Sequence, residues 1–221
     1  MEVIVPFSTD RPKSRLSAVL EPAERADFAL AMLRDVLEAV AAAGGEPRVL
    51  ATGAVDAALP CPVTVDDRPL TDAVNAALDA RVGDAAEGDN GRVAVVMADL
   101  ALATPEALRE LFAAGREADL ALAPGRGGGT NAFVASHPGF RVDYHGASYL
   151  DHRRIADEVD ASVAVVDSHR LATDADEPDD LAELLIHAEA ADGDGGRAAR
   201  WLRDAGFALD ATDGRVGIER E

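Results

Sequence analysis

Lysine is almost absent from this chain. Of its 21 basic residues all but one are arginine, and the single lysine, Lys13, follows an apolar segment at residues 3–7. Arginine and lysine differ in shape, hydration and donor geometry, so they do not replace each other at a close phosphate contact. A lone lysine here, with Arg15 beside it, indicates a loop that neutralises phosphate charge. The competing interpretation is a surface lysine without a special role.

Positive charge is scarce as well. The chain carries 41 acidic residues and a formal net charge of -20, which excludes the basic surface that general nucleic-acid or membrane binding requires. Charges repel one another less in strong salt, because the Debye length falls to ~3 Å at 1 M. The acidic residues run along the whole chain rather than forming a tail. This distribution favours a protein adapted to high salt over an acidic interaction protein.

Cysteine, aromatic residues and long apolar runs are also rare. Cys61 is the one cysteine, so it has no partner for an internal disulfide and cannot form a zinc site by itself. Aromatic residues make up 4% of the chain, so we expect a core of small aliphatic side chains. No run approaches the ~20 apolar residues that cross a bilayer, and no basic leader precedes the first apolar segment. The sequence therefore predicts a cytoplasmic protein that binds neither membranes nor nucleic acid.

Apolar segments that alternate with amphipathic ones predict a single α/β domain over residues 1–221. The predicted strands cover residues 3–7, 48–51, 63–65, 93–97, 120–123, 131–134 and 162–166, with two more around an Asp213-Gly214 turn. The predicted helices cover residues 23–42, 71–81, 150–159, 178–189 and 197–205, with another that opens at Thr104-Pro105. Strands separated by helices imply a mixed, mostly parallel sheet flanked by helices, with loops near residues 83–91 and 190–196.

Two acidic residues are candidate metal ligands. Asp99 ends the predicted strand 93–97, and the carboxyl ends of strands are where open α/β sheets bind ligands. Mg²⁺ takes one or two carboxylates together with substrate phosphates. Asp176 lies in the acidic loop before the helix at 178, so it is free to be a second ligand. The alternative for Asp99 is a helix cap or a turn residue.

Two further motifs are candidate anion sites. In the glycine-rich stretch 125–129, Gly128 and Gly129 let backbone N–H groups approach an anion, unless the stretch is only a flexible loop. Ser148, with His152 four residues later, precedes a predicted helix. Its hydroxyl could bind phosphate or carboxylate, or act as an ordinary N-cap.

These motifs resemble those of one known family when they are taken in their order along the chain. The matching segments are Lys13-Ser14-Arg15-Leu16-Ser17, Glu24-Arg25, Met97-Ala98-Asp99-Leu100, Gly127-Gly128-Gly129-Thr130-Asn131, Ser148 with His152, and the acidic run 174–181. Together they resemble the 2-phospho-L-lactate guanylyltransferase family (CofC) of coenzyme F420 biosynthesis, in a haloarchaeal form. The likeness covers about the whole chain, and the segments around Lys13 and Thr130 are its most specific parts.

The resemblance implies a nucleotidyltransferase with a glycosyltransferase-A-like, Rossmann-type fold. Such an enzyme would join GTP to 2-phospho-L-lactate, or to phosphoenolpyruvate, and release pyrophosphate. The resemblance implies that Asp99 and Asp176 bind Mg²⁺. It assigns catalysis to Lys13, Arg15 and Asp99, with the two basic residues in contact with the GTP phosphates. The implied substrate-binding residues are Thr130, Ser148, Gly128, Gly129, Gly146 and Asn75. The resemblance also implies a homodimer.

The chain departs from the family pattern at two places. The family often has Tyr-Gly-x-x-Ser, whereas this chain has Tyr144-His145-Gly146-Ala147-Ser148, so the backbone contact to the acid could come from His145 or Gly146. A Gly-Leu-Asn stretch reads Ala73-Val74-Asn75 here, which leaves Asn75 as the contact to the base. Two alternatives stay open: another nucleotidyltransferase of this fold, such as a molybdopterin guanylyltransferase or a cytidylyltransferase, and a non-catalytic nucleotide-binding protein.

Overall fold

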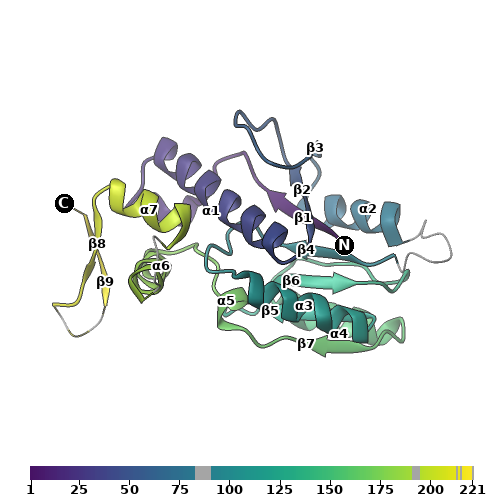
Figure 1. Cartoon of the computed structure of the whole chain (residues 1–221). Helices are drawn as coiled ribbons and strands as arrows, with labels where there is room; N and C mark the ends of the chain where they lie inside the picture. Colours follow the sequence, from purple (N-terminus) through teal and green to yellow (C-terminus); the bar gives the residue numbers. More distant parts are fainter. Residues whose placement is uncertain (83–90, 191–194, 213, 215, 221) are drawn as a thin grey trace.

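A seven-stranded sheet with helices on both faces forms the centre of the fold (Figure 1). The computed structural model describes residues 1–82, 91–190, 195–212, 214 and 216–220. In chain order its elements are β1 (Glu2–Phe7), η1 (Ser14–Ala18), α1 (Pro22–Ala42), β2 (Glu46–Ala51), β3 (Val63–Val65), α2 (Leu70–Val82), β4 (Val93–Val96), α3 (Pro105–Glu117), β5 (Leu120–Pro124), β6 (Thr130–Ala135), α4 (Ser148–Glu158), β7 (Val163–Val165), α5 (His169–Ala172), α6 (Pro178–Ala190), α7 (Gly196–Asp204), β8 (Phe207–Asp210) and β9 (Gly217–Arg220).

The sheet is mixed and mostly parallel, as the sequence predicts. The strand order is β3-β2-β1-β4-β6-β5-β7, and β6 alone runs antiparallel to its neighbours β4 and β5. The other pairings are parallel. The carboxyl ends of β1, β4 and β5 therefore lie at the same edge of the sheet as the first residue of β6. The ends of β1 and β4 thus meet the β5–β6 connection, which is far from both in the sequence.

Two cores lie on opposite faces of the sheet. α1 and α3 pack on one face, where alternate strand residues such as Val3, Val5 and Val134 are buried. α2 and α4 lie on the other face, over Ile4, Phe133 and their neighbours. Alternate residues of a strand point to opposite faces, so strands covered on both sides are apolar throughout. β4, with the sequence Val-Ala-Val-Val, is buried at every position.

A third layer covers the outer side of α1. α6, α7 and the β8–β9 hairpin gather there, away from the main sheet (Figure 1). Phe28 and Met32 of α1 meet Leu185 and Leu202 of this layer. Asp35 of α1 accepts hydrogen bonds from the first backbone N–H groups of α7, which would otherwise lack partners. This layer places α6, and the acidic loop before it, beside the sheet edge described above.

The predicted elements are found, with shifts of a few residues at their ends. Thr104 caps α3 as expected, since its Oγ1 accepts a hydrogen bond from the N–H of Ala107 at 3.3 Å. The helix predicted to start at residue 150 begins at Ser148 instead, with Ala147 as its N-cap. η1 and α5 have five and four residues, too few for a periodic apolar pattern, and the sequence did not predict them. Residues 83–90, 191–194 and 213, within the predicted loops and turn, lie outside the described residues.

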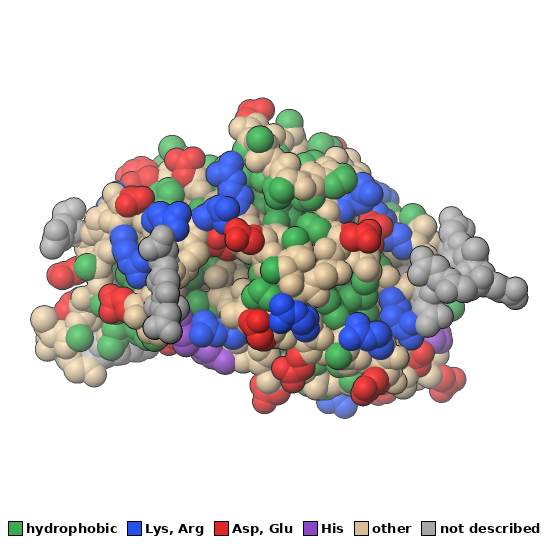
Figure 2. Space-filling view, viewed as in Figure 1, with side chains coloured by type: hydrophobic (Ala, Val, Ile, Leu, Met, Phe, Trp, Pro, Cys, Tyr) green, Lys and Arg blue, Asp and Glu red, His purple; other side chains and the backbone are tan. Residues whose placement is uncertain are grey.

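Acidic and basic side chains are interspersed over the face seen in Figure 2 rather than separated into zones. In the described part of the chain, no helix is both long enough and apolar enough to cross a bilayer.

We expect Gly115→Ala to destabilise the fold because α3 crosses β6 at this glycine. A Cβ at Gly115 would lie 2.4 Å from Cγ1 of the buried Val134. Alanine gains about 1 kcal/mol over glycine within a helix, whereas such overpacking costs about 1–3 kcal/mol or more. The contact is short enough that we expect a net loss of about 1–2 kcal/mol in the free energy of unfolding. Gly217→Ala, where no atom of the described residues lies within 4 Å of the added carbon, is the control. Equal denaturation midpoints for the two variants would contradict the packing argument.

Candidate active site

Lys13 lies between two carboxylates. Its Nζ donates to Oδ2 of Asp99 at 2.8 Å and to Oδ1 of Asp176 at 2.6 Å. Its side chain is only 9% exposed. The backbone of Lys13 is left-handed, with φ 53°, which is uncommon for a residue with a side chain. This turn at the start of η1 aims the ammonium group at the sheet edge.

The sheet topology explains why these three residues meet. Lys13 lies in the loop after β1, and Asp99 lies three residues after β4, the neighbouring parallel strand. Asp176 comes from the loop between α5 and α6. The backbone N–H of Ala175 donates to the carbonyl of Asp99 at 3.2 Å and ties the two acidic loops together.

The ammonium group of Lys13 is held in its charged form. Burial alone would lower its pKa, but the charges of Asp99 and Asp176, and its hydrogen bonds to both, outweigh burial and raise the pKa above the ordinary value. Arg15, which is largely exposed, adds an ion pair to Oδ2 of Asp176 at 3.2 Å. Lys13 and Arg15, the two basic residues predicted from the sequence, therefore both form ion pairs with Asp176.

Asp174 is a third carboxylate at this place. Its ligand oxygen and those of Asp99 and Asp176 lie within 4.8 Å of one another. Burial, and then the charge of Asp99, raises the pKa of Asp174. Oδ1 of Asp99 is buried and has no hydrogen-bond partner among the residues that the structure describes. An orphaned carboxylate oxygen inside a group of three acids fits the oxygen ligands that Mg²⁺ prefers.

The acidic loop is held in place by neutral and charged partners. Nδ2 of Asn131 donates to Oδ1 of Asp174 at 3.3 Å and to the carbonyl of Leu171 at 3.1 Å. A Cβ at Gly125 would fall 2.4 Å from Oδ1 of Asn131, so only glycine leaves room for this amide. On the other side, Oδ2 of Asp180 accepts from the N–H of Asp176 at 3.0 Å.

Thr130 and Ser148 are hydrogen-bonded to each other, and His152 contacts Thr130. The N–H of Thr130 donates to Oγ of Ser148 at 3.0 Å. Nδ1 of His152 lies 2.9 Å from Oγ1 of Thr130, and Nε2 of His152 accepts from the N–H of Asp143 at 3.0 Å. Nε2 is thus unprotonated, and the ring must carry its proton on Nδ1 and donate to Thr130. Both hydroxyl protons, of Thr130 and of Ser148, are then free to donate to an anion.

The predicted glycines frame this hydroxyl pair. Gly128 has φ +83° and its carbonyl accepts from the N–H of Tyr149, in the first turn of α4. A Cβ at Gly129 would lie 3.9 Å from Oγ of Ser148. Gly146 also has a positive φ, +51°, and open space around it. The glycines therefore place no side chain beside Thr130 and Ser148, which are themselves buried.

Asn131 links the two halves of the site. It follows Thr130 in β6, its carbonyl accepts from the N–H of Met97 at 3.0 Å, and its amide holds Asp174. A cavity of about 180 Å³ opens beside Lys13, Asp99 and Asp176. A larger cavity, of about 520 Å³, lies elsewhere between α1, α6 and α7 and contains none of the predicted site residues.

Comparison with known proteins decides the family. A family model described as "Guanylyl transferase CofC like" matches residues 1–220. The chain belongs to the CofC family. A 2-phospho-L-lactate guanylyltransferase of Halorubrum lacusprofundi is 81% identical over 222 residues, covering 100% of both chains. One of Haloferax volcanii is 55% identical over 221 residues, covering 100% of this chain and 99% of its own.

Solved structures agree on the nucleotidyltransferase fold of this CofC chain. A candidate nucleotide-diphospho-sugar transferase from Desulfovibrio desulfuricans G20 superposes with a TM-score of 0.74, at 17% identity, over 92% of this chain and 94% of its own. A nucleotidyl transferase from Methanothermobacter superposes with a TM-score of 0.57, at 16% identity, over 86% of this chain and 98% of its own. At such identities the likeness concerns the fold alone.

Among the residues named for the CofC resemblance, Asn75 stands apart. Its Nδ2 donates to the carbonyl of Val142 at 3.0 Å, and its Oδ1 accepts from the N–H of Val142 at 2.8 Å. The amide thus joins α2 to the segment before α4. Its contact with a base stays a prediction.

Sequence reasoning missed Asp174 and the supporting role of Asn131. The spacing Asp174-x-Asp176 was visible, since alternate residues of an extended loop can face the same way, but a chain with 41 acidic residues makes any one aspartate weak as a signal. Asn131 was visible only as part of a motif.

We expect Lys13→Met to destabilise the metal-free protein, because it leaves Asp99 and Asp176 side by side without a cation. Breaking a fully buried ion pair costs about 3–5 kcal/mol, and these carboxylates are about 30% exposed, so a loss of about 1–3 kcal/mol follows. Chemical denaturation in the presence of a chelator measures it. Arg11→Met is the control, since Arg11 and Asp10 are both exposed and 3.6 Å apart, and it should change stability by less than about 0.5 kcal/mol. If Lys13→Met left the free energy of unfolding unchanged, Lys13, Asp99 and Asp176 would not be energetically coupled.

We expect His152 to make the fold sensitive to acid. Burial lowers the pKa of His152 to about 4. In the unfolded chain a histidine titrates near ~6.5, so between ~6.5 and 4 the unfolded state binds a proton that the native state does not. The contribution of neutral His152 to the free energy of unfolding is complete above that window. It is lost as pH falls through the window, by about 2 kcal/mol between pH 7 and pH 5.

His152→Gln should remove this part of the pH dependence. Free energies of unfolding at several pH values test it, with Leu150→Gln, at an exposed position of α4, as the control that keeps the wild-type slope. If the free energy of unfolding fell equally steeply with decreasing pH in wild type and in His152→Gln, His152 would not be the source of the acid sensitivity.

Proposed function

We propose that this chain transfers the GMP part of GTP to a small phosphoacid and releases pyrophosphate. The observation that carries the proposal is the Lys13 ammonium group among Asp99, Asp174 and Asp176, at the same sheet edge as the hydroxyl groups of Thr130 and Ser148. The names of the relatives support 2-phospho-L-lactate as the acid, with phosphoenolpyruvate as the alternative. The reaction would serve coenzyme F420 biosynthesis.

The chemistry balances without a general base. An oxygen of the acid's phosphate attacks the α-phosphorus of GTP, a new P–O–P bond forms, and the bond to the β-phosphate breaks with pyrophosphate as the leaving group. A phosphate dianion is already a nucleophile, so no proton has to be removed. The protein then acts by positioning the two anions and neutralising their charge.

The residues divide between the two substrates in this proposal. Lys13 and Arg15 donate to the triphosphate, which competes with the carboxylates for both side chains. Thr130 and Ser148 donate hydroxyl protons to the acid, and the backbone at Gly128 and Gly129 closes on it. Asp99, Asp174 and Asp176 would hold Mg²⁺, which when bound supplies positive charge to phosphate oxygens.

Several properties accompany the proposal. A carboxylate site of this kind makes Mg²⁺ the expected cofactor, and the net charge of -20 supports function in concentrated salt. A cytoplasmic location fits a biosynthetic transferase, and a homodimer is the expected assembly. Size-exclusion chromatography with light scattering in molar KCl measures the assembly directly.

Pyrophosphate release tests the function. Protein in molar KCl with Mg²⁺ is offered GTP, ATP or CTP with 2-phospho-L-lactate, phosphoenolpyruvate or no acid. We expect release only from GTP with one phosphoacid. Release from CTP would favour the cytidylyltransferase alternative, and no release from folded protein with any pair would favour a binding protein.

Two variants test the assigned roles. Lys13→Met should lower kcat on the order of 100-fold or more, the usual cost of removing a preorganised charge at a reacting group, whereas Arg11→Met should keep the wild-type rate. Thr130→Val removes a hydroxyl without changing size, so we expect a higher KM for the phosphoacid and an unchanged KM for GTP. Near wild-type kinetics for Lys13→Met would remove Lys13 from the mechanism.

A further inference from the structure

Three metal-binding side chains meet where α5 and α6 touch, away from the candidate active site. Glu183 and His187 are one turn apart on α6, and His169 begins α5. Nε2 of His169 lies 3.1 Å from Nε2 of His187. Oε2 of Glu183 lies 3.6 Å from Nε2 of His187 and 3.9 Å from Nε2 of His169. Two of the chain's 5 histidines are used here.

These separations match a four-coordinate metal. Zn²⁺ binds imidazole nitrogen and carboxylate oxygen at ~2.0–2.2 Å in a tetrahedron, so neighbouring ligand atoms lie ~3.3–3.6 Å apart. The three measured distances surround that value. Mg²⁺ prefers oxygen ligands and octahedral geometry, so two nitrogens in three donors select against the ion expected at Asp99 and Asp176.

A hydrogen bond between the two imidazoles is the metal-free explanation. It accounts for the 3.1 Å separation of the ring nitrogens. It does not account for Glu183, whose oxygen faces both nitrogens yet is beyond hydrogen-bond distance of either. One cation among the three atoms would account for all three separations.

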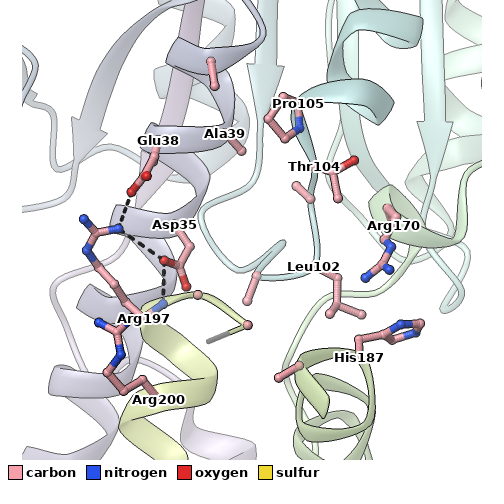
Figure 3. Close-up of a pocket in the computed structure, with 16 residues that line it drawn as sticks. Asp35, Glu38, Ala39, Leu102, Thr104, Pro105, Arg170, His187, Arg197 and Arg200 are labelled. Carbon is pink, nitrogen blue, oxygen red and sulfur yellow. Dashed lines mark hydrogen bonds and ion pairs between the residues drawn. The ribbon is translucent and has the colours of Figure 1, made fainter. Parts of the chain in front are cut away.

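The surroundings leave room for a further ligand. His169 is half-exposed, and His187 lines the cavity of about 520 Å³ beside Arg170, as Figure 3 shows. The nearby charge of Arg170 opposes a cation here, and the carboxylate of Glu183 offsets it.

We propose that His169, Glu183 and His187 bind a divalent transition metal of the Zn²⁺ type, with an exogenous ligand completing the shell. The site clamps α5 to α6. The loop between those helices, 173–177, carries Asp174 and Asp176, so a bound metal restrains both ends of the segment that supplies two of the three active-site carboxylates.

Cobalt titration tests the proposal, because four-coordinate Co²⁺ absorbs strongly in the visible range. Chelator-treated full-length protein is titrated with Co²⁺ in excess Mg²⁺, and then with Zn²⁺ as competitor. We expect one Co²⁺ per chain with a four-coordinate spectrum, displaced by Zn²⁺. Losing an outer partner of a metal ligand costs about 10–100-fold in affinity, so His169→Gln and His187→Gln, which remove a ligand itself, should weaken binding by about 100-fold or more.

Two control variants separate this site from the carboxylate site. His137→Gln changes a histidine elsewhere, and Asp176→Asn changes the candidate Mg²⁺ site, and both should bind Co²⁺ as the wild type does. Hydrogen exchange of residues 173–177 should slow with Zn²⁺ in the wild type and not in His187→Gln. Glu183→Gln, at a partly exposed position, replaces any histidine variant that fails to fold.

Three outcomes overturn the proposal. They are the absence of a four-coordinate spectrum, equal Co²⁺ affinity in wild type and His187→Gln, and loss of binding in Asp176→Asn but not in His169→Gln. None of these measurements uses catalytic activity. The metal-site proposal can therefore be refuted while the proposed transferase function is upheld, and the transferase function can be refuted while the metal site is upheld.

Discussion

The ion pairs of Lys13 with Asp99 and Asp176 are the interaction on which the candidate site depends. The turn before η1 supplies the ammonium group, and the loops after β4 and α5 supply the two carboxylates that meet it. Without a cation at that point, the carboxylates of a strongly acidic chain would repel one another at short range. The lysine therefore holds these segments together, and under the proposed function a triphosphate would have to compete with the two carboxylates to reach it.

Most of the fold could be predicted because its signals are local. An all-apolar segment such as β4 marks a strand covered on both faces, and Thr104-Pro105 marks the start of α3. The antiparallel insertion of β6 between β4 and β5 has no local signal, since apolar strands look alike whichever way they run. Yet that insertion brings Thr130 to the same edge as Asp99, and only the folded sheet shows it.

The candidate site divides in the same way. Lys13 and Asp99 follow the carboxyl ends of strands, where position alone indicates a ligand, whereas Thr130, the first residue of β6, was named by the family resemblance. Asp174 needs the path of a loop that no pattern encodes, and the structure places it in the carboxylate group. The tautomer of His152 depends on the N–H of Asp143, a contact that only the folded chain creates. Residues that act through a neighbour's hydrogen bond are the ones that sequence reasoning fails to find.

The near absence of lysine has a practical consequence for labelling chemistry. Lys13 carries the only side-chain amine of the chain, and that amine lies in the candidate site. An amine-selective reagent then has this ε-amine and the α-amino group at the start of the chain as its targets. Peptide mapping distinguishes the two adducts, so the degree to which a nucleotide protects the ε-amine of Lys13 reports occupancy of the candidate site without any engineered tag.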